Sequence, residues 1–226
     1  DRLRLLPFAA LLDGQGQFLT QKYRLSTYTA AAGDNAGKAP QQQWGITAFG
    51  STLGSQRDKL PILPAVKQEL QAIVRTTATP QGILPGKLLL DPTFTLNAWR
   101  AMLESKAAQG QRSVLHVATH FNLAPGNFLE STLLLGDETT YSVRELHNAL
   151  DADLNDIDLV TLSACNSVIG ERADGKEFEG LGATFQNKGA RAVLGSLWAV
   201  ADTSTAELMR EFYKARGETR ANSKAK

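Results

Sequence analysis

Two residues with the chemistry of a covalent enzyme follow apolar segments of this chain. Cys165, the only cysteine among 226 residues, comes shortly after the run 158–162, and His120 comes shortly after the run 113–118. A thiol attacks a carbonyl carbon as the thiolate, and a neighbouring imidazole can accept its proton. We therefore predict that the two runs are adjacent parallel strands, whose carboxyl ends bring His120 beside Cys165.

Purely structural roles are the alternative to catalysis for the cysteine and the histidines. A free cysteine is often an inert core residue, so an inert buried thiol remains open for Cys165. His116 lies inside a predicted strand and is interpreted as a core residue, and His147 lies in a predicted helix and is interpreted as a surface residue. Neither follows the end of a strand, which leaves His120 as the candidate partner of the thiol.

Asp202 is a candidate substrate-binding residue at the end of the apolar run 192–200. The alternative is a helix N-cap, a position that aspartate favours. However, Ser204 and Glu207 have the spacing of a capping box for the same helix, which would free the Asp202 carboxylate. A carboxylate facing a cleft would bind a cationic group such as that of Arg or Lys.

The segments that position these residues alternate between strand and helix patterns. Strand patterns occupy 44–49, 82–90, 113–118, 131–135, 158–162 and 192–200, and helical periodicity occupies 63–75, 95–108, 142–150, 178–188 and the segment that begins near 204. This order predicts an α/β fold with a mostly parallel central sheet and helices on both faces.

We interpret residues 1–226 as one domain, a size that can bury a substantial core. Residues 1–30 are predicted to form an N-terminal strand and hairpin region, with one strand within 3–12 and a returning strand within 18–28. The polar residues 217–226 are predicted to form a disordered tail.

Composition narrows the classes of partner. The formal net charge of +1 gives no electrostatic basis for binding nucleic acid or an anionic membrane, and no apolar run is long enough to span a bilayer. A single cysteine excludes an internal disulfide and argues against a cysteine-based zinc site. We expect no metal, no cofactor and a reducing, cytoplasmic location.

Several motifs together resemble a known family. The motifs are LRLLPFAAL, SVLHVATHF, STLLLGDE, DLVTLSACNS, EGLGATFQNKGARAVLGSLWAVADTST and LMREFY. In this order they resemble the CHAT domain, a caspase-like peptidase domain of clan CD that often follows tetratricopeptide repeats in bacteria. The spacing of 45 residues between His120 and Cys165 is also close to the roughly 50 residues of caspases.

The resemblance implies a caspase–hemoglobinase fold and a cysteine endopeptidase with His120 and Cys165 as its dyad. The backbone amides of Phe121 and Cys165 would then hold the oxyanion. Asp202 matches the aspartate of the LWxVxD pattern in the related separase, where it helps form the pocket for arginine. The implied partners are a protein substrate cut after Arg or Lys, and a tetratricopeptide-repeat region or another regulatory protein.

The chain also departs from the family pattern. Phe121 and Val168 stand where many relatives have glycine, both close to the expected oxyanion site. Compared with the family pattern, the sequence lacks the usual opening stretch and the last helix and strand, and we interpret it as a domain truncated at both ends or as an unusually short member. These departures keep a catalytically silent interaction module open as an alternative. An acyl-transfer enzyme acting on small substrates is a further one, and it predicts a closed pocket instead of a groove.

Overall fold

The computed structural model describes residues 8–23, 25, 30–32, 39–41, 43–56, 60–105, 113–124, 126–163, 176–195 and 202–224, except the side chains of 30, 176–179, 202 and 218–224. The strands are β1 Ile46–Gly50, β2 Val74–Arg75, β3 Leu84–Leu90, β4 Val114–Ala118, β5 Phe121–Asn122, β6 Thr132–Leu134, β7 Thr140–Ser142, β8 Leu159–Leu162 and β9 Val193–Gly195. The helices are α1 Leu19–Lys22, α2 Ala65–Ile73, α3 Leu96–Glu104, α4 Val143–Asn148, α5 Lys176–Asn187 and α6 Asp202–Lys224.

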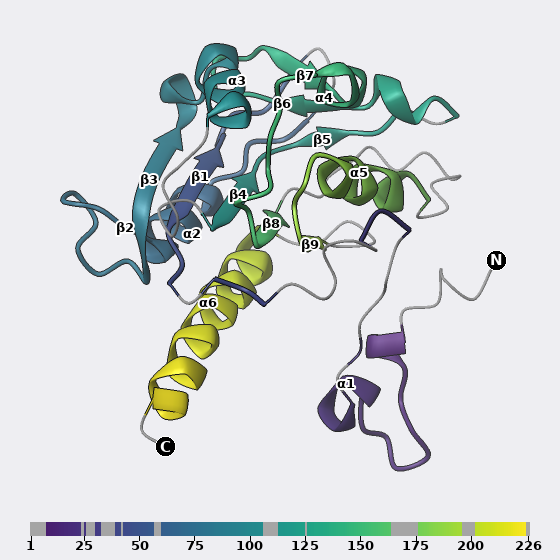
Figure 1. The fold of residues 1–226 in the computed structure, drawn as a ribbon, viewed down its shortest axis with the longest axis vertical. Coiled ribbons are helices and arrows are strands. Elements are labelled where there is room, and N and C mark those ends of the chain that lie inside the picture. Colours follow the sequence, from purple (N-terminus) through teal and green to yellow (C-terminus); the bar gives the residue numbers. More distant parts are fainter. Residues whose placement is uncertain are drawn as a thin grey trace.

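Six of these strands form a parallel sheet in the order β2-β3-β1-β4-β8-β9 (Figure 1). The predicted α/β class with a parallel central sheet is therefore confirmed. The prediction that the runs 113–118 and 158–162 form adjacent parallel strands is confirmed as well, since β4 pairs with β8. A second sheet, β5-β6-β7, is antiparallel and lies beyond the end of β4.

Side chains alternate between the two faces of the parallel sheet, and each face has its own helices. On one face, Val114 and Ala118 of β4 pack with α2 and α6. On the other face, Leu115 and Val117 pack with α3, α4, α5 and the small sheet. The period of two along β4 explains this division, because successive side chains of a strand point to opposite faces. Helices therefore cover both faces, as predicted.

Local sequence signals account for the starts of two helices. The Thr95 hydroxyl accepts the Ala98 N–H at 3.2 Å at the start of α3. Ser142 and Glu145 form a reciprocal capping box at the start of α4, as their spacing predicts. Another prediction differs in detail, since the chain passes from α2 directly into the short strand β2 instead of continuing the helix to Arg75.

The strands predicted within 3–12 and 18–28 do not form in the described part of these segments. Phe8–Ala10 is a 3-10 helix, and Leu19–Lys22 of the second segment form helix α1. The Gln21 side chain accepts the Phe18 N–H at 2.9 Å, which satisfies a donor at the start of a helical turn and favours the turn over an extended strand.

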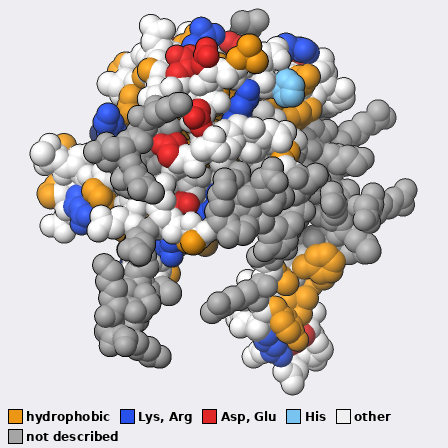
Figure 2. Space-filling view, in the orientation of Figure 1, with side chains coloured by type: hydrophobic (Ala, Val, Ile, Leu, Met, Phe, Trp, Pro, Cys, Tyr) orange, Lys and Arg blue, Asp and Glu red, His pale blue; other side chains and the backbone are white. Residues whose placement is uncertain are grey.

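Residues 8–23 form an arm beside the body of the molecule (Figure 1), closed by an antiparallel bridge between Leu12 and Phe18. Large apolar side chains are exposed along it, namely Phe8, Leu11, Leu12, Phe18 and Tyr23. Figure 2 shows them as a hydrophobic patch at the lower right of the molecule. The patch has the composition of a contact surface.

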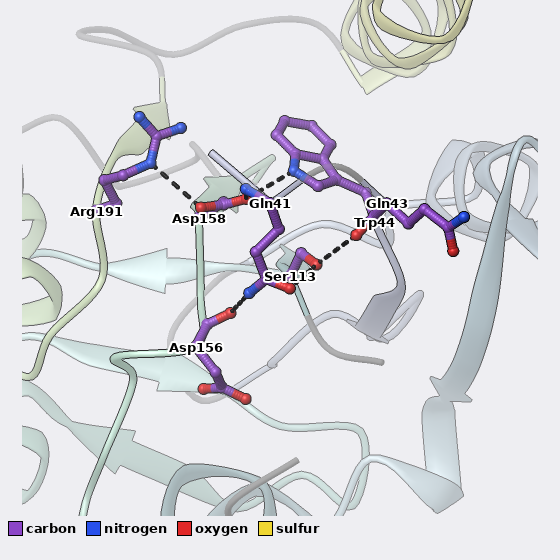
Figure 3. Close-up of polar contacts among 7 residues, drawn as sticks. All are labelled: Gln41, Gln43, Trp44, Ser113, Asp156, Asp158 and Arg191. Carbon is purple, nitrogen blue, oxygen red and sulfur yellow. Dashed lines mark hydrogen bonds and ion pairs between the residues drawn. The ribbon is translucent and has the colours of Figure 1, made fainter. Parts of the chain in front are cut away.

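Asp158, just before β8, ties together the amino-terminal ends of several strands (Figure 3). Its carboxylate accepts the Trp44 indole N–H at 2.9 Å, the Gln41 backbone N–H at 2.6 Å and the Arg191 guanidinium at 3.2 Å. Ser113, just before β4, also donates to Gln41. Gln41 and Trp44 precede β1, and Arg191 precedes β9, so this carboxylate links the amino-terminal ends of β1, β8 and β9. Ser113 adds β4 to this end of the sheet through Gln41.

The carboxyl-terminal helix α6 is longer than its sequence pattern predicts. It continues through Lys224, so most of the segment 217–226, predicted to be a disordered tail, is helical. None of the helices within the described ranges combines the length and apolar character needed to cross a membrane.

Candidate functional site

The carboxyl ends of β1 and β4 mark the place where the chain changes direction across the sheet. From β1 the chain adds β3 and β2 on one side, and from β4 it adds β8 and β9 on the other. Open parallel sheets bind their ligands in the crevice at such a switch point. His120 follows β4 by two residues and therefore lies at this point.

His120 is fully buried, and a backbone carbonyl holds its ring. Its Nε2 lies 2.6 Å from the carbonyl oxygen of Pro61, 59 residues earlier in the chain. A carbonyl oxygen can only accept, so Nε2 carries the hydrogen of this bond. In the neutral ring Nδ1 is then the basic nitrogen, which is the one able to take a proton from a nucleophile.

Close packing fixes the Pro61 carbonyl. Gly54 packs against the backbone of Leu60 and Pro61: a Cβ built on it would clash with the Leu60 carbonyl oxygen and would lie 2.8 Å from the carbonyl carbon of Pro61 and 2.9 Å from its oxygen, closer than side-chain carbons approach such atoms. The same loop is pinned by Asp91, whose carboxylate accepts the Thr52 N–H at 2.7 Å and the Thr52 hydroxyl at 3.0 Å. Asp91 adopts a left-handed backbone with φ of 50°, a conformation that aspartate tolerates better than most residues.

Phe121 combines a buried side chain with a backbone amide that faces away from β6. Its ring is 4% exposed and belongs to the core beneath α3 and α5. The Leu134 N–H bonds the His120 carbonyl at 2.9 Å, and Phe121 is opposite Leu133. Because hydrogen-bonded and non-bonded pairs alternate in an antiparallel ladder, the Phe121 amide is not directed at β6.

Cys165 and Val168 lie outside the described residues, so the predicted dyad is not placed. Strand β8 ends at Leu162, and the next residue, Ser163, is the last described one before Cys165; its N–H bonds the Val117 carbonyl at 2.9 Å and continues the ladder with β4. The Ser163 hydroxyl is buried at this strand end without a hydrogen-bond partner among the described residues.

Asp202 begins helix α6, and its side chain lies outside the described part. The predicted capping box is wrong, because Ser204 is already a residue of the helix and cannot be its N-cap. Ser204 and Glu207 therefore do not replace Asp202 at the start of this helix. An acidic side chain in the first helical turn is favoured by the helix dipole whether or not it binds a substrate.

The other two histidines lie where their patterns predict. His116 is buried on β4 and hydrogen-bonded to Glu69 and Tyr213, and His147 is exposed on α4. The roles of Pro61 and Asp91 have no signature in the sequence. Pro61 contributes a backbone oxygen, and Asp91 binds the distant loop at Thr52. The left-handed conformation of Asp91 at the end of β3 gives no signal in the sequence beyond the turn that Pro92 favours.

In the ranges that the structure describes, no three His, Cys, Asp or Glu side chains gather as metal ligands would.

The model of one protein family, described as CHAT domain, matches residues 1–225. No curated protein matches the chain.

Proposed function

The chain belongs to the CHAT domain family, and from that premise we propose that it is a cysteine endopeptidase with His120 and Cys165 as its dyad, cutting a protein after Arg or Lys. Domains of this family are caspase-like and of the cysteine-peptidase type, and the parallel sheet covered by helices on both faces agrees with such a fold. The dyad, the substrate and the preference for a basic residue are proposals.

The register between β4 and β8 carries the assignment of the dyad. Val114 is opposite Leu159 and Val117 is opposite Leu162, an offset of 45 residues (159 − 114). His120 and Cys165 are separated by the same 45 residues (165 − 120). If the ladder keeps its register for three more positions, these two residues are opposite each other and point to the same face of the sheet.

The hydrogen bond to Pro61 gives His120 the tautomer that the reaction needs. Nδ1 of the ring accepts the proton of the Cys165 thiol, and the thiolate sulfur then forms a bond to the carbonyl carbon of the substrate. The carbon–nitrogen bond breaks as the imidazolium returns its proton to the leaving amine, and water later releases the acyl group from sulfur. The amides of Phe121 and Cys165 are proposed to hold the oxyanion, an interaction worth about 2.7–4 kcal/mol per donor in enzymes.

The proposed preference for a basic residue rests on Asp202. Helix α6 begins at this residue, and α6 covers the face of the sheet toward which His116 and, by the period of two, His120 point. An aspartate at the near end of this helix would pair with the guanidinium or ammonium group of the substrate. This pairing gives the carboxylate a role beyond the helix dipole.

Peptide turnover tests the proposal. A library of peptides with Arg or Lys before the cleaved bond should be cut by the wild type and left intact by Cys165→Ala and by His120→Ala. Asp202→Asn should impair cleavage after Arg and Lys while the thermal midpoint stays within a few degrees of the wild type. Cleavage that survives Cys165→Ala refutes the assignment, and loss of folding in Asp202→Asn favours a purely structural role for that residue.

One observation favours a second candidate, a catalytically silent interaction module. The His120 ring is 0% exposed, so a peptide reaches it only if neighbouring chain moves. An arginine-directed electrophile separates the candidates, because a peptidase, once opened, becomes labelled at Cys165. A silent module stays unlabelled at Cys165 under every condition while an iodoacetamide control still reports whether the thiol is reachable.

A further inference from the structure

A hydrogen-bonded network of four buried polar side chains connects β4, β8, α2 and α6 beneath the candidate site. His116 on β4 places Nε2 2.9 Å from a Glu69 carboxylate oxygen on α2 and Nδ1 3.1 Å from the Tyr213 hydroxyl on α6. The same hydroxyl lies 2.7 Å from the Thr161 hydroxyl on β8. None of the four residues is more than 2% exposed.

The hydrogen bonds of this network are all satisfied by one assignment of donors and acceptors. Burial raises the pKa of Tyr213, so its hydroxyl keeps its proton at neutral pH. With Nε2 donating to the Glu69 carboxylate, the neutral His116 ring accepts the Tyr213 proton at Nδ1, and Tyr213 in turn accepts from Thr161. Because an unpaired buried polar atom is costly, a shift of α2 or α6 along the sheet would leave donors and acceptors unsatisfied. The bonds therefore define a single position for both helices.

The two strands that carry this network, β4 and β8, also lead to the proposed dyad. His116 precedes His120 by four residues, and Thr161 precedes Cys165 by four. Their positions are paired directly in the register of β4 with β8. At about 3.3 Å per residue, four residues separate the network from the dyad by about 13 Å, too far for direct contact.

The two helices of this network, α2 and α6, lead to the remaining parts of the proposed site. Pro61, whose carbonyl holds His120, lies eight residues before Glu69, on the segment that leads into α2. Asp202, the proposed partner of the basic substrate residue, lies eleven residues before Tyr213 on α6. Each residue of the network is thus on, or directly follows, an element that supplies one part of the site.

We propose that Glu69, His116, Thr161 and Tyr213 form a positioning network, which aligns the Pro61 carbonyl and Asp202 with the dyad by holding α2 and α6 at fixed positions on β4 and β8. This inference rests on the proposed peptidase function. It assigns the four residues no contact with the substrate. It predicts that the two ends of the network affect different kinetic constants, since α2 leads back to the ring of His120 and α6 leads back to the substrate pocket.

Tyr213→Phe and Glu69→Leu test the two ends. Tyr213→Phe keeps the ring and removes the bridging hydroxyl, so KM for peptides with a basic residue should rise about tenfold with a smaller change in kcat. Glu69→Leu should lower kcat about tenfold through the His120 ring, and Glu69→Gln, which keeps an acceptor oxygen for His116, should restore most of it.

Phe212→Leu is the matched control. Phe212 neighbours Tyr213 on α6, with ring centroids 5.1 Å apart, and is partly buried against the same core without belonging to the network. We expect this variant to lose stability while keeping both kinetic constants within about twofold. The thermal midpoint of every variant is measured beside its kinetics, so a variant that fails to fold is recognised, and Thr161→Val then replaces Tyr213→Phe as the test of the hydroxyl bridge.

Two failures are distinguishable. If the wild type cleaves, and Tyr213→Phe and Phe212→Leu lose activity equally and in proportion to their stability, the network is merely structural and this inference is wrong. If the wild type cleaves no peptide, and the rate of Cys165 alkylation by iodoacetamide is the same with and without His120→Ala, the proposed function itself fails. The positioning role then fails with it.

Discussion

Replacing Gly54 by alanine should loosen the hold of Pro61 on His120. The new Cβ would clash first with the Leu60 carbonyl oxygen, and it would also lie 2.8 Å and 2.9 Å from the carbonyl carbon and oxygen of Pro61, so the backbone at both residues must give way. Taking an ordinary contact as about 3.5 Å, the carbonyl must retreat by roughly 0.6 Å. If it moves away from the ring, the hydrogen bond of 2.6 Å to Nε2 lengthens to the outer limit of such bonds, about 3.2 Å.

Loss of this bond should be visible in the ring and in turnover. The chain has only three histidines, so ¹⁵N signals of the imidazole rings can be assigned to His120, His116 and His147. In the wild type, neutral His120 should carry its hydrogen on Nε2, and in Gly54→Ala this preference should weaken. Peptide cleavage should fall about tenfold, since small misplacements of catalytic groups are costly.

Gly82→Ala is the matched control for this prediction. Its Cβ would meet the backbone of Val74 at the far edge of the sheet, so it imposes the same kind of clash away from His120. Overpacking should cost each variant about 1–3 kcal/mol of stability. The reasoning is refuted if folded Gly54→Ala keeps the wild-type tautomer and turnover, or if Gly82→Ala loses activity to the same extent.

Three further predictions concern stability. Asp158→Ala leaves the donors of Gln41, Trp44 and Arg191 without this acceptor and should lower the free energy of unfolding by about 3 kcal/mol in urea denaturation; a change under about 1 kcal/mol would contradict its anchoring role. Burial, together with the Glu145 carboxylate, raises the pKa of Tyr141 to about 12 from an ordinary 10.0. The unfolded chain therefore loses this proton first, so stability should fall from about pH 10 to about pH 12, and Tyr141→Phe should reduce that fall in thermal scans; an unchanged pH profile would argue against it. Thr95→Ala should cost about 1 kcal/mol through loss of the α3 cap, by the same denaturation assay, and a neutral result would show that the cap is dispensable.

Periodicity and small-residue turns were sufficient to predict the alternating strands and helices. The runs 113–118 and 158–162 are short, apolar and followed by polar residues, which is enough to identify buried parallel strands. Their direct pairing could be inferred from the chemistry expected of their ends, and the register of β4 with β8 agrees with the spacing of His120 and Cys165.

What could not be predicted depends on tertiary contacts. The Pro61 carbonyl is a backbone atom, and its bond to His120 spans 59 residues without any side-chain pattern. Glu69 looks like a solvent-facing helix residue until α2 is placed against His116. Near the amino terminus, the apolar residues resemble a strand, but in the described residues they find only the isolated bridge of Leu12 with Phe18, and a strand without a partner is not stable.

Disulfide trapping tests the central claim, that the register of β4 and β8 brings position 120 beside position 165. Since Cys165 is the only natural cysteine, His120→Cys contains one possible pair, and opposed positions on neighbouring strands lie within the 4.4–6.8 Å between Cα atoms that a disulfide spans. Mild oxidation should close this bond in the folded variant, as seen by mass spectrometry without reduction. Thr119→Cys, whose native side chain points to the Leu134 carbonyl, should not close one. A variant His120→Cys that stays reduced, or closes no faster than Thr119→Cys, would contradict the account.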